Sequence, residues 1–334
     1  MTSNPLVSIL MPVRNEGKHL NACIQSIRQQ DYPIWELIAI DDQSTDDSWQ
    51  QLQVWASKDT RIHVYQNKGK GIIDALKTGL DQARGEYVTR MDADDLMLPA
   101  KLGRLLEPLK DERVDISTGR VKYAGRQLGN GFIRYEHWVN NQLPQNFWQQ
   151  IYYECPLPSP CWMCRIDLFK SALHDPSMIY PEDYFWAFWL YEKEATICKS
   201  PHFLHIWRDY QERTSRIDPN YADQGFINLK LHFFMQQHHG SARGILLLGA
   251  GKKGKRLAKL MVQKNLSFEW ITNNPRKIGM RIYGVTLRDQ SENLSHLNNR
   301  KVILAISSPE EFQNIHSWLK IKGLEDGIDI FRFY

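Results

Sequence analysis

Two acidic clusters hold the side chains in this sequence that are best suited to chemistry. The first, Asp92-Ala93-Asp94-Asp95, follows a short β-prone run that would deliver three carboxylates to one sheet edge. Hard oxygen ligands of this kind suit Mg²⁺ or Mn²⁺, and carboxylates packed together repel one another unless a cation is present. The second cluster, Glu182-Asp183, offers a candidate base. The sequence therefore predicts a divalent-metal site and a proton acceptor.

Strands and helices alternate through the first hundred residues. Apolar runs at 6–11, 35–40, 62–65 and 87–91 predict strands, and helical spacing predicts helices around 20–27, 52–55 and 72–83. This alternation predicts an α/β fold with a mostly parallel sheet and helices on both faces. Polar residues follow three of the strands, after Met11, Ile40 and Met91, at the sheet edge where such folds bind ligands.

A second α/β unit is predicted near the C-terminus. Residues 245–248 read as a buried strand, and Gly249, Gly251 and Gly254 then fit a G-x-G-x-x-G turn before a helix. Four cations at 252, 253, 255 and 256 crowd that helix start, which favours an anionic ligand. The acidic residue that NAD binding needs about twenty positions later is replaced by Thr272-Asn273-Asn274. We expect a smaller Rossmann-like domain that binds a nucleotide or serves in packing.

Length and composition bound the remaining choices. A chain of 334 residues predicts two domains, which we place at 1–240 and 241–334. With 42 basic and 38 acidic side chains the net charge is +4, so nucleic acid is not an expected partner. The N-terminus lacks the pattern of a secretory signal, and no apolar run reaches the length of a membrane span. We expect a cytoplasmic protein, and its 11 Trp and 14 Tyr leave open a peripheral contact with the inner face of the membrane.

Three ordered motifs resemble the family 2 glycosyltransferases, which have the GT-A fold. The resemblance runs over roughly residues 5–215. It is specific because several motifs occur in the order and at the intervals expected for the family. The motifs are Val7-Ser8-Ile9-Leu10-Met11-Pro12-Val13-Arg14-Asn15-Glu16, Asp41-Asp42-Gln43-Ser44-Thr45-Asp46 and Arg90-Met91-Asp92-Ala93-Asp94-Asp95.

The resemblance implies a nucleotide-diphosphate-sugar donor, usually a UDP-sugar. In the family, a turn after the first strand and an acidic pair after the second hold the base and ribose. The matching residues here are Pro12, Val13, Arg14, Glu16, Asp41 and Asp42. The DxD element, here Asp92 and Asp94, contacts ribose and carries Mn²⁺ or Mg²⁺, which neutralises the leaving nucleoside diphosphate.

The resemblance also implies an acceptor side. The run Tyr180-Pro181-Glu182-Asp183-Tyr184 is similar to the family's ED motif, whose aspartate, here Asp183, is the expected general base. One displacement at the anomeric carbon would invert it. Arg208 matches an arginine that lies near the phosphates. The implied acceptor is a carbohydrate or lipid-linked hydroxyl in polysaccharide or glycolipid assembly.

Two other functions stay open on sequence alone. The glycine-rich turn suggests an NAD(P)-dependent oxidoreductase acting through the C-terminal domain. Departures from the family pattern at Lys77, Ser159 and Phe185 suggest a non-catalytic nucleotide-sugar-binding scaffold. The acidic turns also fit plain helix caps, and the aromatic stretch 184–191 fits either core or an acceptor surface.

Overall fold

The computed structural model describes residues 4–125, 128–211, 213, 216, 223–238, 244–290, 297 and 300–334, and the structural statements below concern these residues. The chain forms two compact units: Met1–Gln145 with Leu157–Asp218, and Asn146–Pro156 with Pro219–Tyr334. The predicted division at residue 240 lies outside the described residues. The compact units divide near residue 218, and the second one also includes Asn146–Pro156 from the middle of the chain. Because these units are defined by contacts, the boundary between folding domains at residue 240 stays a prediction.

A mixed eight-stranded sheet organises the first unit, in the order β3-β2-β1-β4-β7-β6-β8-β5. Strands β1 to β4 pair in parallel, as the alternating pattern predicted. Strand β7 is antiparallel to β4 and β6, and β5 is antiparallel to β8. The bounds are β1 (Val7–Val13), β2 (Trp35–Asp41), β3 (Ile62–Gln66), β4 (Tyr87–Arg90), β5 (Leu96–Met97), β6 (Ile116–Ala124), β7 (Trp162–Arg165) and β8 (Ile197–Arg208).

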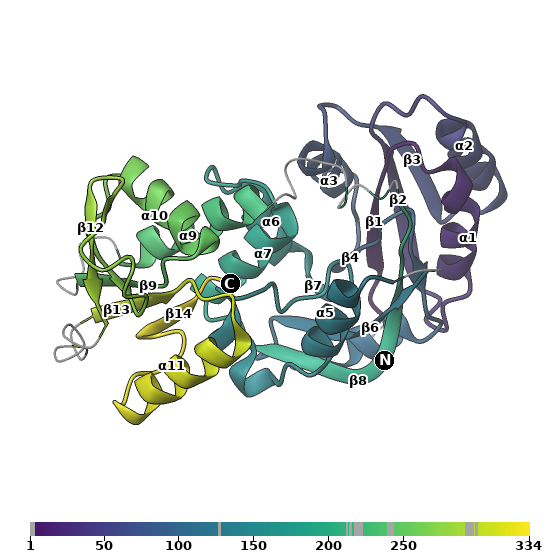
Figure 1. The fold of residues 1–334 in the computed structure, drawn as a ribbon. Helices are drawn as coiled ribbons and strands as arrows, with labels where there is room; N and C mark the ends of the chain where they lie inside the picture. The colour runs from purple at the N-terminus through teal and green to yellow at the C-terminus, as the bar shows by residue number, and fades with distance from the viewer. Residues whose placement is uncertain are drawn as a thin grey trace. The chain divides into compact units, whose positions relative to one another are not determined.

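Helices cover both faces of the parallel half. Helices α1 and α2 lie on one face of β1 to β3 and α3 lies on the other (Figure 1). The helical spacing of Leu20, Cys23, Ile24 and Ile27 puts one side of α1 wholly in the core, and burying an aliphatic side chain contributes about 1.5–3 kcal/mol. The helices are α1 (Gly17–Arg28), α2 (Ser48–Lys58), α3 (Ile72–Leu80), α4 (Lys101–Leu106), α5 (Asn130–Asn140), α6 (Ile166–Leu173) and α7 (Glu182–Glu192), with short 3₁₀ helices η1 (Glu107–Lys110) and η2 (Pro144–Gln150).

Helix α7 is almost entirely core. Tyr184, Phe185 and Phe188 are wholly buried, Trp186 is 2% exposed, and even Trp189 is only 8% exposed. The rings of Tyr184 and Phe188 stack with centroids 5.0 Å apart. The aromatic stretch therefore packs the interior, and the interpretation of it as an acceptor surface is wrong. Its burial fixes the helix N-terminus, where Glu182 and Asp183 lie.

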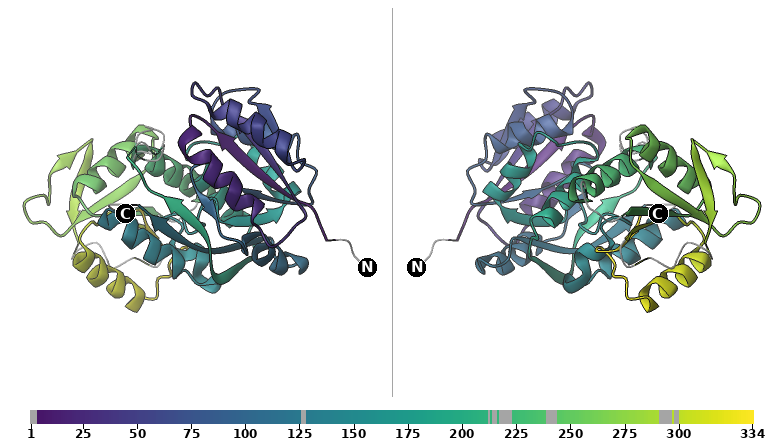
Figure 2. Two further views of the ribbon diagram at one scale, coloured as in Figure 1. Left: turned by 90° about the vertical axis from the view of Figure 1, so that its right-hand side faces the viewer. Right: turned by 90° about the vertical axis from the view of Figure 1, so that its left-hand side faces the viewer.

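The second unit is built on a six-stranded sheet in the order β11-β12-β10-β9-β13-β14, parallel except for β11. The chain runs from the central β9 to β10 on one side and later crosses to β13 on the other, as in Rossmann-like sheets. Figures 1 and 2 show α10 and α11 on opposite faces of this sheet. The elements are α9 (Asp223–His238), β9 (Gly244–Leu248), α10 (Lys252–Gln263), β10 (Phe268–Thr272), β11 (Arg281–Ile282), β12 (Val285–Asp289), β13 (Arg300–Leu304), α11 (Pro309–Ile321) and β14 (Ile330–Arg332).

Among the helices that the structure describes, none combines the length and the apolar character needed to cross a membrane.

Candidate functional site

The loops that follow β1 and β2 are tied together at the carboxyl edge of the sheet. Val13 and Asp41, the last residues of the two strands, stand in register. Beyond them, Asn15 adopts a left-handed backbone conformation (φ 56°), and its Oδ1 accepts a hydrogen bond of 2.7 Å from the amide of Thr45. The amide of Glu16 donates to Ser48 Oγ at 2.9 Å. The first two sequence motifs, residues 7–16 and 41–46, thus form one rim at the carboxyl edge of β1 and β2.

Pro12, Val13 and Arg14 differ in their access to this rim. Pro12 and Val13 are still part of β1, and Val13 is buried. The Arg14 side chain is 57% exposed, and its Nη1 lies 3.8 Å from Oδ2 of Asp42. Arg14 is therefore the one of these three residues whose side chain extends into solvent at the sheet edge.

The neighbours Asp41 and Asp42 are both buried but have different surroundings. Asp42 accepts hydrogen bonds from the Gly71 amide at 3.0 Å and from Asn67 Nδ2 at 2.7 Å, so it holds the loop that precedes α3. Among the described residues, the Asp41 carboxylate accepts only a long bond of 3.3 Å from the Ser44 amide, and no donor reaches its buried Oδ1. A buried acceptor without a partner is costly, so Oδ1 of Asp41 is an acceptor that is available to a water or a ligand.

The carboxylates of Asp92, Asp94 and Asp95 converge just after β4. One oxygen from each lies within 4.8 Å of the others. Burial, together with the neighbouring carboxylates, raises the pKa of Asp94 to about 6, and burial raises the pKa of Asp95 to about 7. Carboxylates that are stripped of water and crowded together require positive charge. Three hard oxygen donors with this need fit Mn²⁺ or Mg²⁺.

Arg90 joins this acidic cluster to the second one. Its guanidinium donates from Nε to Asp92 Oδ1 and from Nη1 to Glu182 Oε1, both at 2.8 Å. Although burial acts in the opposite direction, the Arg90 charge and hydrogen bond lower the pKa of Asp92. The Arg90 and Glu182 side chains are 8% and 3% exposed. The two motifs predicted to share a site thus meet on a single buried cation.

Asp183 is the partly exposed member of the second pair, in the first turn of α7. Its Oδ1 accepts a bond of 2.7 Å from the Tyr184 amide. Burial and the adjacent Glu182 carboxylate raise the pKa of Asp183 to about 7, although Arg90 opposes the shift. A carboxylate with this pKa is a stronger proton acceptor at neutral pH than an ordinary aspartate.

Tyr210 links Glu16 on the rim to the acidic cluster. Its hydroxyl lies 2.9 Å from Asp94 Oδ2 and 3.2 Å from Glu16 Oε1. Its ring packs against His19, with centroids 4.5 Å apart, and His19 Nδ1 lies 2.9 Å from Glu16 Oε2. Burial is the largest influence on Glu16 and raises its pKa. Glu16 and Asp94, predicted separately, are therefore neighbours.

Arg208 lies beside the acidic cluster because β5 pairs with the end of β8. Its guanidinium is occupied by the backbone carbonyls of Asp94 and of His19, the latter at 3.1 Å. Arg213 is the cation that faces Asp94 and Asp95, with Nε 3.5 Å from Asp94 and Nη2 3.3 Å from Asp95. The phosphate-binding role predicted for Arg208 stays a prediction, and Arg213 is the better-placed candidate.

Behind the cluster, Asp95 is held by a buried chain of polar side chains. His205 Nε2 lies 3.0 Å from Asp95 Oδ2, and His205 Nδ1 lies 3.3 Å from the ammonium of Lys101. All three side chains are wholly buried. Asp95 therefore has less freedom than Asp92 and Asp94 to turn toward a ligand.

Close packing explains two of the three glycines in the glycine-rich turn, Gly249 and Gly254. A Cβ on Gly254 would lie 2.0 Å from the Gly249 carbonyl oxygen, and one on Gly249 would lie 2.6 Å from that of Ala305. Gly249 also has a φ of 109°, which L side chains rarely adopt. Gly251 has open space around it. The predicted nucleotide contact of these glycines stays a prediction.

Arg90, Tyr210, Arg213 and His19 were not predicted as site residues. Arg90 could have been predicted from the sequence, because an arginine inside an apolar strand needs buried carboxylate partners. Tyr210 and Arg213 carried none, since only folding brings them to the cluster.

Comparisons with known proteins found glycosyltransferases. Residues 8–172 match the family model Glycosyl transferase family 2. The putative colanic acid biosynthesis glycosyl transferase WcaA of Escherichia coli (strain K12) is 26% identical over 288 residues, 77% of this chain and 98% of the relative. Glycosyltransferase GlyG of Streptococcus pneumoniae serotype 4 is 32% identical over 129 residues, 38% of this chain, and the match spans only 43% of the relative.

Two solved structures share the fold. Staphylococcus aureus TarS 1-349 in complex with UDP-GlcNAc gives a TM-score of 0.52 at 17% identity, covering 78% of this chain and 72% of that one. The mannosyltransferase PcManGT of Pyrobaculum calidifontis, in complex with GDP-Man and Mn²⁺, gives 0.51 at 20% identity, covering 72% and 71%.

Proposed function

Because this chain belongs to glycosyl transferase family 2 and has the GT-A fold, we propose that it transfers a sugar from a UDP-sugar to a hydroxyl of a carbohydrate or lipid-linked acceptor, with inversion. The observation that carries the proposal is the Arg90 bridge, which brings Asp92 and Glu182 onto one guanidinium. The name of WcaA, a putative colanic acid biosynthesis enzyme, supports a role in polysaccharide or glycolipid assembly.

The rim of β1 and β2 would hold the nucleoside. Oδ1 of Asp41, which no donor reaches within the described part of the chain, can accept a hydrogen bond from the base. Asp42 would act mainly through the loop at Gly71 that it holds in place. Pro12, Val13, Arg14 and Glu16 would complete the rim.

The carboxylates of Asp92 and Asp94 would hold Mn²⁺ or Mg²⁺, with Asp95 behind them. A divalent cation there would neutralise the charge that the leaving nucleoside diphosphate gains. The Mn²⁺ in the PcManGT structure supports this assignment. Arg213 supplies further positive charge beside the cluster, and Tyr210 holds Glu16 and Asp94 in one arrangement.

Asp183 would be the general base. Its carboxylate accepts the proton of the acceptor hydroxyl as that oxygen bonds to the anomeric carbon, and the bond from that carbon to the phosphate oxygen breaks. Attack from the side opposite the leaving group inverts the carbon. Arg90 and Glu182 position Asp183 relative to the donor without taking the proton themselves.

A donor screen tests the proposal. Purified protein is incubated with Mn²⁺ and a panel of UDP-sugars and GDP-sugars, and released nucleoside diphosphate is measured by a coupled assay. We expect slow release of UDP from one UDP-sugar, because water can replace the acceptor. Donor binding without any release, even with added acceptor saccharides, would instead indicate a binding scaffold. A lipid-linked acceptor would place the reaction at the inner face of the membrane, which liposome flotation can test.

A further inference from the structure

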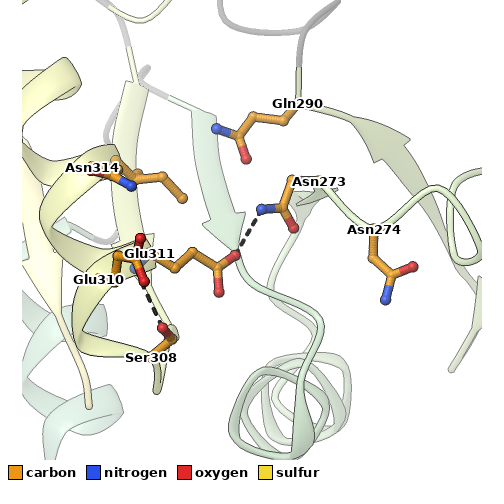
Figure 3. Close-up of a pocket in the computed structure, with 8 residues that line it drawn as sticks. Asn273, Asn274, Gln290, Ser308, Glu310, Glu311 and Asn314 are labelled. Atoms are coloured by element: carbon orange, nitrogen blue, oxygen red, sulfur yellow. Dashed lines mark hydrogen bonds between the residues drawn. The ribbon is translucent and has the colours of Figure 1, made fainter.

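The second unit carries a polar pocket that the proposed transfer reaction does not use. It lies at the carboxyl ends of β10 and β12 and at the start of α11, and it has a cavity volume of about 640 Å³. Figure 3 shows side chains from all three elements converging on it. The carboxyl edge of a Rossmann-like sheet is the expected ligand position.

The chemistry of the pocket wall is uncharged or anionic. Side-chain amides come from Asn273, Asn274, Gln290 and Asn314, and carboxylates come from Glu310 and Glu311. No lysine or arginine is among the described residues that line it. Phosphate groups brought against two carboxylates would meet repulsion without a compensating cation.

A hydrogen bond also crosses the place where a dinucleotide would lie. Nδ2 of Asn273, just after β10, donates to Glu311 Oε1 on α11 at 2.9 Å (Figure 3). Because β9 stands between β10 and β13, this bond spans the point where the strand order reverses. A dinucleotide would have to break it. The glycine pattern does not argue otherwise, since close packing already requires Gly249 and Gly254.

The same groups match a ligand rich in hydroxyls. Each amide offers both a donor and an acceptor, and carboxylates accept from hydroxyl groups. Ile315, which is 8% exposed, adds an apolar contact for the face of a sugar ring. We propose that this pocket binds an uncharged sugar unit and so gives the chain a saccharide site apart from the transfer site. We assign this sugar to the acceptor chain. That assignment rests on the proposed function, whereas the binding of a sugar to the pocket does not.

NMR on the full chain tests the proposal. The side-chain amide signals of Asn273, Gln290 and Asn314 are followed while methyl glycosides of neutral hexoses and of N-acetylhexosamines are added to about 50 mM, because single sugars bind at about millimolar Kd. We expect at least one methyl glycoside to shift these signals saturably in the wild type, and to leave the Asn273 and Gln290 signals in place in Asn314→Ala. Gln313→Ala is the matched control, an exposed amide on the same helix outside the pocket, and it should bind as the wild type does.

Other outcomes overturn the proposal. If NADH, UDP or inorganic phosphate shifts the same signals and no glycoside does, the pocket is a nucleotide or anion site. If only Mn²⁺ shifts these amide signals, the pocket is a cation site. If no added compound shifts them, the pocket is not a ligand site. UDP release in the donor screen distinguishes failure of this proposal from failure of the proposed function. Asn314→Ala should release UDP as fast as the wild type does, whether or not the pocket binds a sugar.

Discussion

The guanidinium of Arg90 lies 2.8 Å from the carboxylate of Glu182, although 92 positions separate the two residues in the chain. Both side chains are almost fully buried, and Arg90 also holds Asp92. The candidate metal ligands and the candidate base are therefore positioned by one shared ion-pair network. Several consequences can be measured.

Replacing Arg90 should damage both stability and activity. Arg90→Met leaves two carboxylates without their cation, and breaking a buried ion pair costs about 3–5 kcal/mol of unfolding free energy. Urea unfolding followed by tryptophan fluorescence measures the loss. The control is Arg113→Met, since Arg113 is 88% exposed and its pair with Asp111 lies at the surface, so no measurable change is expected. A loss below about 1 kcal/mol in Arg90→Met would mean that the network does not hold the site together.

Asp183→Asn should abolish turnover while donor binding stays nearly intact. An asparagine keeps the shape of the side chain but accepts no proton, and loss of a general base costs about a hundredfold to ten-thousandfold in rate. Steady-state transfer rates and UDP titration measure the two quantities. Glu192→Gln, an exposed change at the other end of α7, is the control and should leave both unchanged. Equal transfer rates in Asp183→Asn and the wild type would remove Asp183 from the mechanism.

The pH profile gives a second view of the same residue. The pKa of Asp183 is raised to about 7 by burial and by Glu182. Only the deprotonated carboxylate can take the proton, so kcat/KM should fall about tenfold per pH unit below that pKa and level off above it. A profile that is flat down to about pH 5 would contradict this assignment.

Asp41 and Asp42 should respond differently to substitution. Asp41→Asn should weaken UDP binding at least about tenfold, because the acceptor proposed to meet the base is changed. Its unfolding free energy should change little, since the Asp41 carboxylate accepts only one long hydrogen bond from the described residues. Asp42→Ala should lower the unfolding free energy by about 1–3 kcal/mol, because it frees the Gly71 amide and Asn67. Calorimetric UDP titration and urea unfolding measure both variants, and the reverse pattern would exchange their roles.

Tyr210→Phe should separate the hydroxyl of this residue from its ring. The variant loses the bonds to Glu16 and Asp94 and keeps the packing against His19. We expect a loss of about 1 kcal/mol in unfolding free energy and weaker UDP binding in the presence of Mn²⁺. Tyr210→Leu removes the ring as well and should lose more. UDP affinity equal to that of the wild type in Tyr210→Phe would show that the hydroxyl does not position the site.

Much of the first sheet could be predicted from local pattern. The apolar runs that became β1 to β4 were bounded by polar turns, and the helical spacing around Leu20 and Ile27 put one face of α1 in the core. Because parallel strands end at one edge, the polar clusters after them had to meet there. The antiparallel direction of β7 was not predicted, because its pairing with β4 and β6 depends on partners far away in sequence.

The rest of the site depends on tertiary contacts that spacing cannot reveal. Arg213 and Tyr210 follow β8, and they reach Asp94 only because β8 pairs with β5. The hydrogen bonds that occupy the Arg208 guanidinium also depend on the pairing of β8 with β5. The compact second unit also includes Asn146–Pro156, a segment that a linear reading assigns to the first domain.

The most direct test of the central claim is calorimetric titration of UDP into the wild type and Asp94→Asn, with Mn²⁺ and with EDTA. Asp81→Asn is the control, because Asp81 is 48% exposed and pairs only with Lys68 in the described structure. We predict UDP binding that requires Mn²⁺, falls at least about tenfold in Asp94→Asn and is unchanged in Asp81→Asn. Equal UDP affinity with Mn²⁺ and with EDTA, or no UDP binding to the wild type at all, would contradict this claim.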